Sequence, residues 1–270
     1  MKIPAFIMAA LAAVSVSAQN YPYKDPTLSN WDRAADIVSR MTLDEKINQV
    51  GHQTKAVSRL GLQGYNYWNE AIHGVARSGL ATSFPVSKAL SSTWDLALMG
   101  KVATAISDEC RVYNNDKNKG LIYWCPTINM SRDPRWGRDE ENYGEDPFLT
   151  GKLAVEFVRG MQGDDPRHYK TIATAKHFAA NNYEKGRHST SSEVDDRNLR
   201  EYYLPAFEMA VKEGNVRSVM SAYNAVNGIP CGASHLLLMD ILRKEWGLTA
   251  SLPPIAALST TCGRRIATTM

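Results

Sequence analysis

The stretch T-I-A-T-A-K-H-F, residues 171–178, decides the fold. Its small and β-branched residues predict a buried strand, and it ends in the charged pair Lys176 and His177. A predicted helix ending at a glycine precedes it (147–163). Another helix, which Asp196 can cap and whose apolar residues have helical spacing, follows it (196–214). Strands that alternate with such helices predict an α/β fold of parallel βαβ units, with the ligand site at the carboxyl ends of the strands.

The same alternation extends in both directions. Strands are expected at 121–125 and 216–223, and helices at 92–114 and 233–246, with Ser92 or Thr93 as the cap of the first. Residues 32–50 also look helical, but T-L-D-E at 42–45 is a capping-box pattern that can divide them into two helices. The 270 residues match the length of a (β/α)8 TIM-like barrel.

Composition excludes several classes of protein. A chain with 44% hydrophobic and 22% charged residues is neither disordered nor fibrous. The net charge of +3 is spread among interspersed residues, so no nucleic-acid partner is expected. No P-loop, G-x-G-x-x-G or H-E-x-x-H motif is present, so neither a nucleotide cofactor nor a metal is expected. Four cysteines are too few for a disulfide scaffold.

The N-terminus predicts export. Lys2 precedes an apolar run at 3–16, and V-S-A at 16–18 is a small-residue cleavage site, so we expect cleavage after Ala18 and a periplasmic or extracellular protein. The alternative, an anchor helix, is disfavoured because the run is short for a bilayer, and no later segment is long and apolar enough to span one. Export would leave Cys110, Cys125 and Cys231 able to pair, without saying which.

Charged and aromatic motifs follow the predicted strands. The first motif, Y-N-Y-W-N-E-A-I-H-G at 65–74, combines aromatic rings with Glu70 and His73. A long charged loop spans 131–146. Tyr223 lies at the end of a predicted strand, as Lys176 and His177 do. Carboxylates and cationic donors bind sugar hydroxyls, and tryptophan or tyrosine covers the ring face. These motifs predict a sugar pocket.

Each motif also has a structural interpretation. Glu70 can be a solvated loop charge, and His73 is more often a structural histidine than a ligand. Trp68 and Trp136 can be core residues. The four charged residues Arg132, Asp133, Arg135 and Arg138 can form ion pairs that hold the long loop, with one arginine reaching the substrate.

The chain carries R-D-P-R-W-G-R at 132–138, A-K-H-F at 175–178 and E-A-I-H-G at 70–74. Together these motifs resemble the N-terminal barrel domain of glycoside hydrolase family 3. The resemblance covers residues 31–247. It implies an exo-acting, retaining β-glycosidase that removes terminal β-linked xylose or glucose from plant-type oligosaccharides. The family uses an Asp nucleophile on the barrel and an acid/base carboxylate that a following domain usually supplies.

The resemblance also assigns roles to individual residues. Glu70 matches the carboxylate that binds sugar hydroxyls, and Glu rather than Asp in this context is typical of the β-xylosidase and arabinosidase branch. Arg138 matches the substrate arginine, Lys176 and His177 the pair that binds equatorial hydroxyls, and Tyr223 the tyrosine near the nucleophile. K-H-F-A-A-N-N-Y at 176–183 disfavours the N-acetylglucosaminidase branch.

The C-terminal stretch departs from the family. There the pattern G-F-D-G-x-V-x-S-D is expected, with the nucleophile last, but residues 251–270 contain no Asp, Glu or aromatic residue. A shifted reading frame after Gly247 is compatible with that pattern and would place the nucleophile across the Pro254–Ile255 junction. We therefore expect a signal peptide (1–18), about six of eight barrel units (19–247) and an out-of-frame tail (248–270) without catalytic residues.

A true short variant with its own ending is the alternative origin of the tail. Either way the chain is expected to be inactive, as a non-catalytic sugar-binding fragment or an inactive gene product. The sequence leaves the choice among xylose, glucose and arabinose open, and it does not fix the oligomeric state.

Overall fold

The computed structural model describes residues 21–165 and 168–249. The chain divides into two compact units, the first ending at Lys46 and the second beginning at Ile47. The predicted signal peptide lies outside the described residues, as does the expected tail except for its first two residues.

The first unit consists of short helices whose ends are fixed by side chains. The hydroxyl of Ser29 accepts a hydrogen bond from the backbone N–H of Asp32 at 3.1 Å and so caps the first helix. Thr42 and Glu45 form a reciprocal capping box, with hydrogen bonds of 2.8 and 3.3 Å. The predicted division into two helices is confirmed. The elements are the 3-10 turn η1 (Pro22–Lys24), α1 (Asn30–Arg40) and α2 (Leu43–Ile47), whose last residue begins the second unit.

The second unit has an α/β architecture. A parallel sheet has the strand order β3-β4-β6, so β4, the stretch that begins the sequence argument, is its central strand. Two small sheets accompany it: an antiparallel pair, β1-β2, and a three-stranded sheet, β5-β7-β8. The strands are β1 (Gln53–Thr54), β2 (Tyr65–Asn66), β3 (Ile122–Tyr123), β4 (Ile172–Phe178), β5 (Ser191–Ser192), β6 (Ser218–Ser221), β7 (Ala225–Val226) and β8 (Ile229–Pro230).

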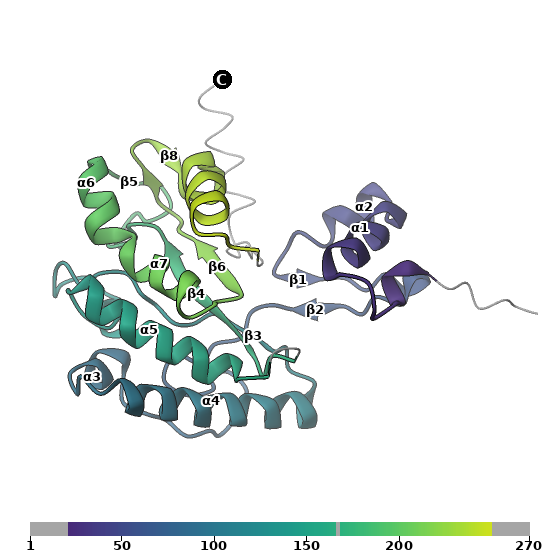
Figure 1. Ribbon diagram of the computed structural model, residues 1–270, viewed down its shortest axis with the longest axis horizontal. Coiled ribbons are helices and arrows are strands. Elements are labelled where there is room, and N and C mark those ends of the chain that lie inside the picture. The colour runs from purple at the N-terminus through teal and green to yellow at the C-terminus, as the bar shows by residue number, and fades with distance from the viewer. Residues whose placement is uncertain (1–20, 166–167, 250–270) are drawn as a thin grey trace, which may run out of the picture. The chain divides into compact units, whose positions relative to one another are not determined.

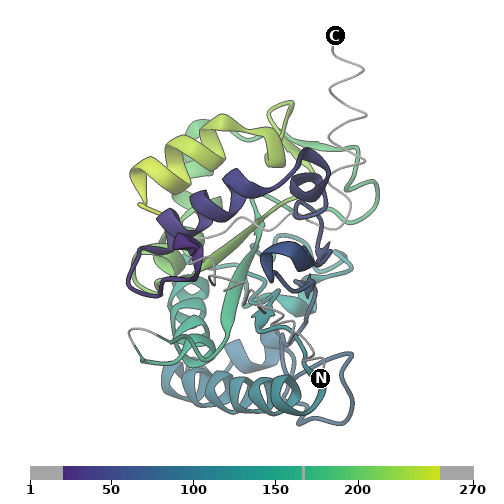
Figure 2. The same cartoon turned by 90° about the vertical axis from the view of Figure 1, so that its right-hand side faces the viewer.

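Helices α4, α5 and α7 form a layer beside the parallel sheet (Figures 1 and 2). The α-helices of this unit are α3 (Ser87–Ser91), α4 (Leu96–Lys117), α5 (Pro147–Gln162), α6 (Asp196–Asn198) and α7 (Pro205–Lys212). The 3-10 turns are η2 (Ser58–Leu60), η3 (Asp139–Glu141) and η5 (Cys231–Ala233), and the π-helical segments are η4 (Leu199–Tyr203) and η6 (Leu236–Glu245).

The core lies between this helix layer and the sheet. Buried residues of α4 recur three and four apart, as on one face of a helix: Met99, Val102, Ala103, Ile106, Ser107 and Cys110. Strand β4 is buried along all but its first residue, and its Phe178 ring contacts the ring of Phe207 from α7. A strand buried on both faces is what parallel βαβ units require.

Two predicted caps are wrong by a few residues. The cap of α4 is Asp95, which accepts from the N–H of Leu98 at 2.9 Å, whereas the hydroxyls of Ser92 and Thr93 donate to carbonyls of the preceding helix α3. The cap of α6 is Asp195 instead of Asp196. Several cap-forming residues stand next to each other at both sites, and the position where the backbone turns into the helix selects among them.

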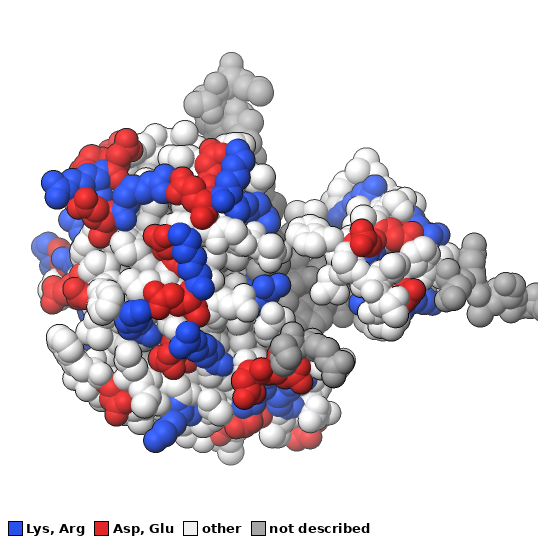
Figure 3. Space-filling view, viewed as in Figure 1, with Lys and Arg blue, Asp and Glu red and all other residues white. Residues whose placement is uncertain are grey.

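Charges of both signs intermingle over the helices of the second unit (Figure 3). Many are paired, as in the Lys152–Glu213 ion pair at 2.6 Å and the Arg159–Glu156 ion pair at 2.7 Å. Cys110, Cys125 and Cys231 are buried as free thiols, so none of them is in a disulfide in this structure. Among the described residues, none of the helices combines the length and apolar character that crossing a membrane requires.

Candidate functional site

Parallel pairing brings the ends of three strands to one edge of the sheet. Lys176 pairs with Met220 of β6 on one side and bridges to Thr127, beyond β3, on the other. The peptide bonds that precede His177 and Ala179 are cis, and the register shifts between Lys176 and Phe178. Residues that follow β3, β4 and β6 therefore lie close together although they are far apart in the sequence.

His177 is buried and held by Asn129 on both its backbone and its ring. Its N–H donates to Asn129 Oδ1 at 2.9 Å, and Asn129 Nδ2 donates to the carbonyl of His177, also at 2.9 Å. This pairing fixes Oδ1 as the acceptor 3.3 Å from the imidazole Nδ1, so Nδ1 carries the proton. The unprotonated Nε2 then accepts from Arg138 Nη1 at 3.2 Å.

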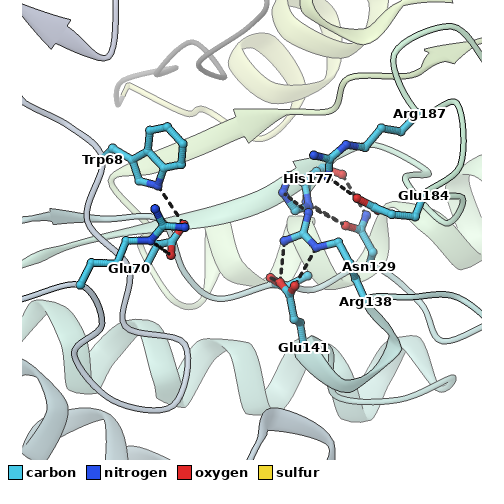
Figure 4. A network of polar contacts seen from close by, with 10 residues as sticks. Trp68, Glu70, Asn129, Arg138, Glu141, His177, Glu184 and Arg187 are labelled. Carbon is cyan, nitrogen blue, oxygen red and sulfur yellow. Dashed lines mark hydrogen bonds and ion pairs between the residues drawn. The ribbon is translucent and has the colours of Figure 1, made fainter. Parts of the chain in front are cut away.

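Arg138 lies between His177 and Glu141 (Figure 4). Its guanidinium makes a two-pronged contact with the carboxylate, Nε donating to Oε1 at 2.7 Å and Nη2 to Oε2 at 2.5 Å. Burial raises the pKa of Glu141, but the hydrogen bonds and charge of Arg138 outweigh it, so the pKa lies below its ordinary value. Arg138 is thus fixed by an ionised partner while its Nη1 faces the imidazole.

A buried ammonium group, that of Lys176, and a buried imidazole, that of His177, share this site. Burial lowers the pKa of Lys176, and the charge of Arg138 lowers it further, while Glu141 and Glu70 oppose the shift. Burial also lowers the pKa of His177 well below its ordinary value, with the charges of Arg138, Lys176 and Arg187 acting in the same direction. His177 is therefore neutral, beside charged neighbours.

Glu70 is not a solvated loop charge. Its Oε1 accepts from Trp68 Nε1 at 2.8 Å, and its Oε2 accepts from Arg77 Nε at 2.8 Å. The Trp68 ring stacks on Trp124 with centroids 5.4 Å apart and planes 18° from parallel. Each carboxylate oxygen keeps a lone pair free for a further donor. A pocket of about 240 Å³ lies beside it, lined by residues from three segments of the chain: Glu70, Ile72, His73, Gly74, Ala76, Val86, Ser87, Glu140 and Glu141.

Tyr223, at the end of the β6 segment, is half-buried against two neighbours. The His188 ring lies with its centroid 4.2 Å from that of Tyr223, and the Arg187 guanidinium carbon is 5.0 Å from the same centroid. The charges of Arg187 and Arg138 both lower the pKa of Tyr223 against the rise that burial causes, and Arg187 also lowers the pKa of His177. The structure therefore brings Arg138, Lys176 and His177 together, with Glu70 and Tyr223 close enough to interact electrostatically with Arg138.

The remaining motif residues have structural partners. His73 Nδ1 lies 2.9 Å from the carbonyl of Phe84, which suits a structural histidine. Arg135 pairs with Asp133 at the surface, and Arg132 donates to the hydroxyl of Tyr203. The charged loop therefore holds separate pairs instead of one network, and Arg138 is the arginine of this group that reaches His177.

Sequence reasoning missed Glu141 and Asn129, which hold Arg138 and His177. The position of Glu141 three residues after Arg138, at a turn, was a detectable signal, but two neighbouring acidic residues compete for the same role. Asn129 had no signal, because its function depends on contact with a residue 48 positions away. Within the described residues, no three His, Cys, Asp or Glu side chains are grouped as metal ligands would be.

The Glycosyl hydrolase family 3 N terminal domain matches residues 37–250. The chain is 43% identical over 241 residues to the exo-1,4-β-xylosidase bxlB of Emericella nidulans, covering 84% of this chain and 32% of that protein. It is 40% identical over 261 residues to a xylan 1,4-β-xylosidase of Xylanibacter ruminicola, covering 92% and 30% respectively. The chain thus spans about a third of the length of these relatives.

Solved structures with a similar fold also belong to family 3 enzymes. A family 3 exo-β-xylosidase, XlnD, in complex with a xylobiose aziridine probe superposes with a TM-score of 0.80 at 38% identity, over 84% of this chain and 31% of that one. The β-glucosidase 3B of Thermotoga neapolitana in complex with glucose gives 0.73 at 34% identity, over 82% and 33%. The predicted (β/α)8-type α/β fold is confirmed, in incomplete form within this chain.

Proposed function

Since the chain belongs to glycosyl hydrolase family 3 through its N-terminal domain, we propose that it carries the sugar-binding part of an exo-acting β-glycosidase. The substrate is an oligosaccharide with a terminal β-linked xylose or glucose. Xylose is favoured because the relatives at 40–43% identity are xylosidases, whereas the glucosidase structure is 34% identical. No cofactor is needed for this chemistry.

The cluster of Arg138, Glu141, Lys176 and His177 carries this proposal. It places two cationic donors and a neutral imidazole at the carboxyl end of a parallel strand, where ligands bind in this architecture. Hydrogen bonds from charged donors to sugar hydroxyls are stronger than neutral ones. We assign hydroxyl binding to Glu70, Arg138, Lys176 and His177, and contact near the reacting carbon to Tyr223.

We further propose that this 270-residue polypeptide binds sugar without hydrolysing it. A retaining glycosidase needs two carboxyl groups about 5–5.5 Å apart, and residues 251–270, where the nucleophile is expected, contain neither Asp nor Glu. The proposed division is a signal peptide cleaved after Ala18, a partial barrel to Gly247 and an out-of-frame tail. Codons at the Pro254–Ile255 junction that do not spell GAT or GAC across it would refute the shifted frame.

Calorimetric titration of the full chain with xylose and then with glucose tests the binding site. Lys176→Met should abolish the heat of binding, because a buried ammonium donor is lost. It should also raise the free energy of unfolding by about 1 kcal/mol, because a charge is no longer buried beside Arg138.

Lys152→Met is the matched control, since Lys152 forms an ion pair with Glu213 away from the cluster. It should bind sugar as the unchanged chain does. Unaltered binding in Lys176→Met would contradict the assigned site. A folded chain that binds neither sugar would favour an inactive gene product over a sugar-binding fragment.

A further inference from the structure

Arg187 has no assigned role in the proposed sugar site, yet it lies over the ring of one of its residues and its charge acts on another. It follows β4 in a loop closed by a turn at Gly186, and Figure 4 shows its guanidinium pointing toward His177. The same guanidinium lies over the ring of Tyr223, with its central carbon 5.0 Å from the centroid. Arg187 therefore lies over one predicted sugar ligand and points toward another.

The Arg187 guanidinium is anchored by a neighbouring carboxylate. Its Nη1 donates to Glu184 Oε1 in an ion pair three residues apart, and about a third of each side chain is exposed. The ring of His188 covers Tyr223 as well, with centroids 4.2 Å apart. Two consecutive residues of one loop thus hold the aromatic ring, and Glu184 holds the first of them.

We propose that Arg187 is a positioning residue of the sugar site: braced by Glu184, it fixes the ring of Tyr223, and with it the phenol hydroxyl, relative to His177. The inference rests on the proposed sugar-binding function. A cation over an aromatic face is attractive when the ring is partly desolvated, as it is here. Arg187 acts on the sugar through Tyr223, because its own guanidinium is engaged by the carboxylate and the ring.

The supporting electrostatics are consistent with this placement. The charge of Arg187 lowers the pKa of Tyr223 against the rise that burial causes, and it is one of three charges that lower the pKa of His177. The other two, Arg138 and Lys176, come from different elements, so removing Arg187 leaves His177 neutral. The main effect of its loss is then on the position of Tyr223.

A double-mutant cycle on the full chain separates positioning from direct sugar contact. Arg187→Met should weaken xylose binding about tenfold, and Tyr223→Phe should weaken it by removing the hydroxyl. Combining both should be no worse than Tyr223→Phe alone, within twofold, because Arg187 then has no hydroxyl to position. Effects that multiply would overturn the proposal, because they would show that Arg187 contacts the sugar itself.

A second readout needs no sugar and so stands even if the chain does not bind xylose. In a spectrum of ¹³C-labelled tyrosine rings, the Tyr223 signal is the one that Tyr223→Phe removes. Arg187→Met should shift it, whereas Arg197→Met, which breaks a comparable but exposed pair with Glu201, should not. An unshifted Tyr223 signal in folded Arg187→Met would overturn the proposal. Absence of xylose binding with the shift present would instead contradict the sugar-binding function.

Discussion

His177 is a side chain whose protonation is set by its surroundings. Its Nδ1 proton is directed at Asn129 and its Nε2 faces Arg138, so a second proton on the ring would point at a guanidinium. Burial and the charges of Arg138, Lys176 and Arg187 lower its pKa well below the ordinary value near 6.5. His177 thus stays neutral over the whole neutral range, with its one acceptor nitrogen engaged by Arg138.

This lowered pKa makes folding stability depend on pH. Below about pH 6.5 the unfolded chain binds a proton at His177 that the folded chain does not, so the free energy of unfolding falls as pH falls. His177 changes the free energy of unfolding by up to ~1.4 kcal/mol per pH unit. His177→Gln should remove that part of the slope in urea unfolding measured between pH 7 and 5.

His168→Gln provides the matched control, because His168 is an exposed histidine. It should keep the slope of the unchanged chain. Equal slopes for the unchanged chain and His177→Gln would mean that His177 is protonated in the folded state, contrary to the hydrogen-bond pattern.

The packing of α4 against α5 depends on a position without a side chain. A Cβ added at Gly160 would lie 2.7 Å from the carbonyl oxygen of Gly100, 2.7 Å from the Cβ of Ala103 and 2.9 Å from the backbone nitrogen of Thr104. Real Cβ contacts do not come this close, and backbone atoms cannot step aside as a flexible side chain can. The two helices would have to move apart.

Gly160→Ala should therefore lower the free energy of unfolding by up to about 2 kcal/mol. Overpacking costs about 1–3 kcal/mol, and the better helix propensity of alanine returns about 1. Thermal unfolding followed by circular dichroism measures the difference. Gly137→Ala is the control, since nothing lies within 4 Å of an added Cβ there. A Gly160→Ala variant as stable as Gly137→Ala would show that the helices are less closely packed than described.

The parallel sheet of the second unit is open within the described residues. Strands β3 and β6 each pair with β4 on one side and with no further strand on the other. An unpaired strand edge favours association between chains. In a closed barrel both edges would be paired, and the site would be surrounded by strand ends instead of lying at one margin.

We expect the 270-residue chain to associate as its concentration rises and to leave p-nitrophenyl β-xyloside intact. The polypeptide that continues in the shifted frame after Gly247 should stay monomeric and hydrolyse the substrate, because it supplies the nucleophile strand and the strands that pair with the open edges of the sheet. Light scattering and a colorimetric assay on the two proteins make the comparison. Turnover by the purified 270-residue chain would contradict the proposed lack of catalysis.

Much of this arrangement is readable from local sequence. The small and β-branched residues before Lys176 predict a buried strand, and Gly163 and the capping box at Thr42 mark helix boundaries, because these signals depend on neighbours within one or two turns. Lys176 and His177 can be placed at the ligand edge for the same reason, since a parallel strand ends there. Alternation of strands and helices then fixes the fold class.

The partners of those side chains depend on the fold. Asn129 meets His177 only because β3 and β4 pair in one register, and Arg187 meets Tyr223 only because a loop after β4 folds over the end of β6. Such contacts join residues tens of positions apart, so no local pattern encodes them. The sequence alone therefore predicted that Lys176 and His177 end a buried strand at the proposed sugar site. The tertiary structure decided the protonation and orientation of these side chains, because both follow from burial and from the charges that long-range packing brings near.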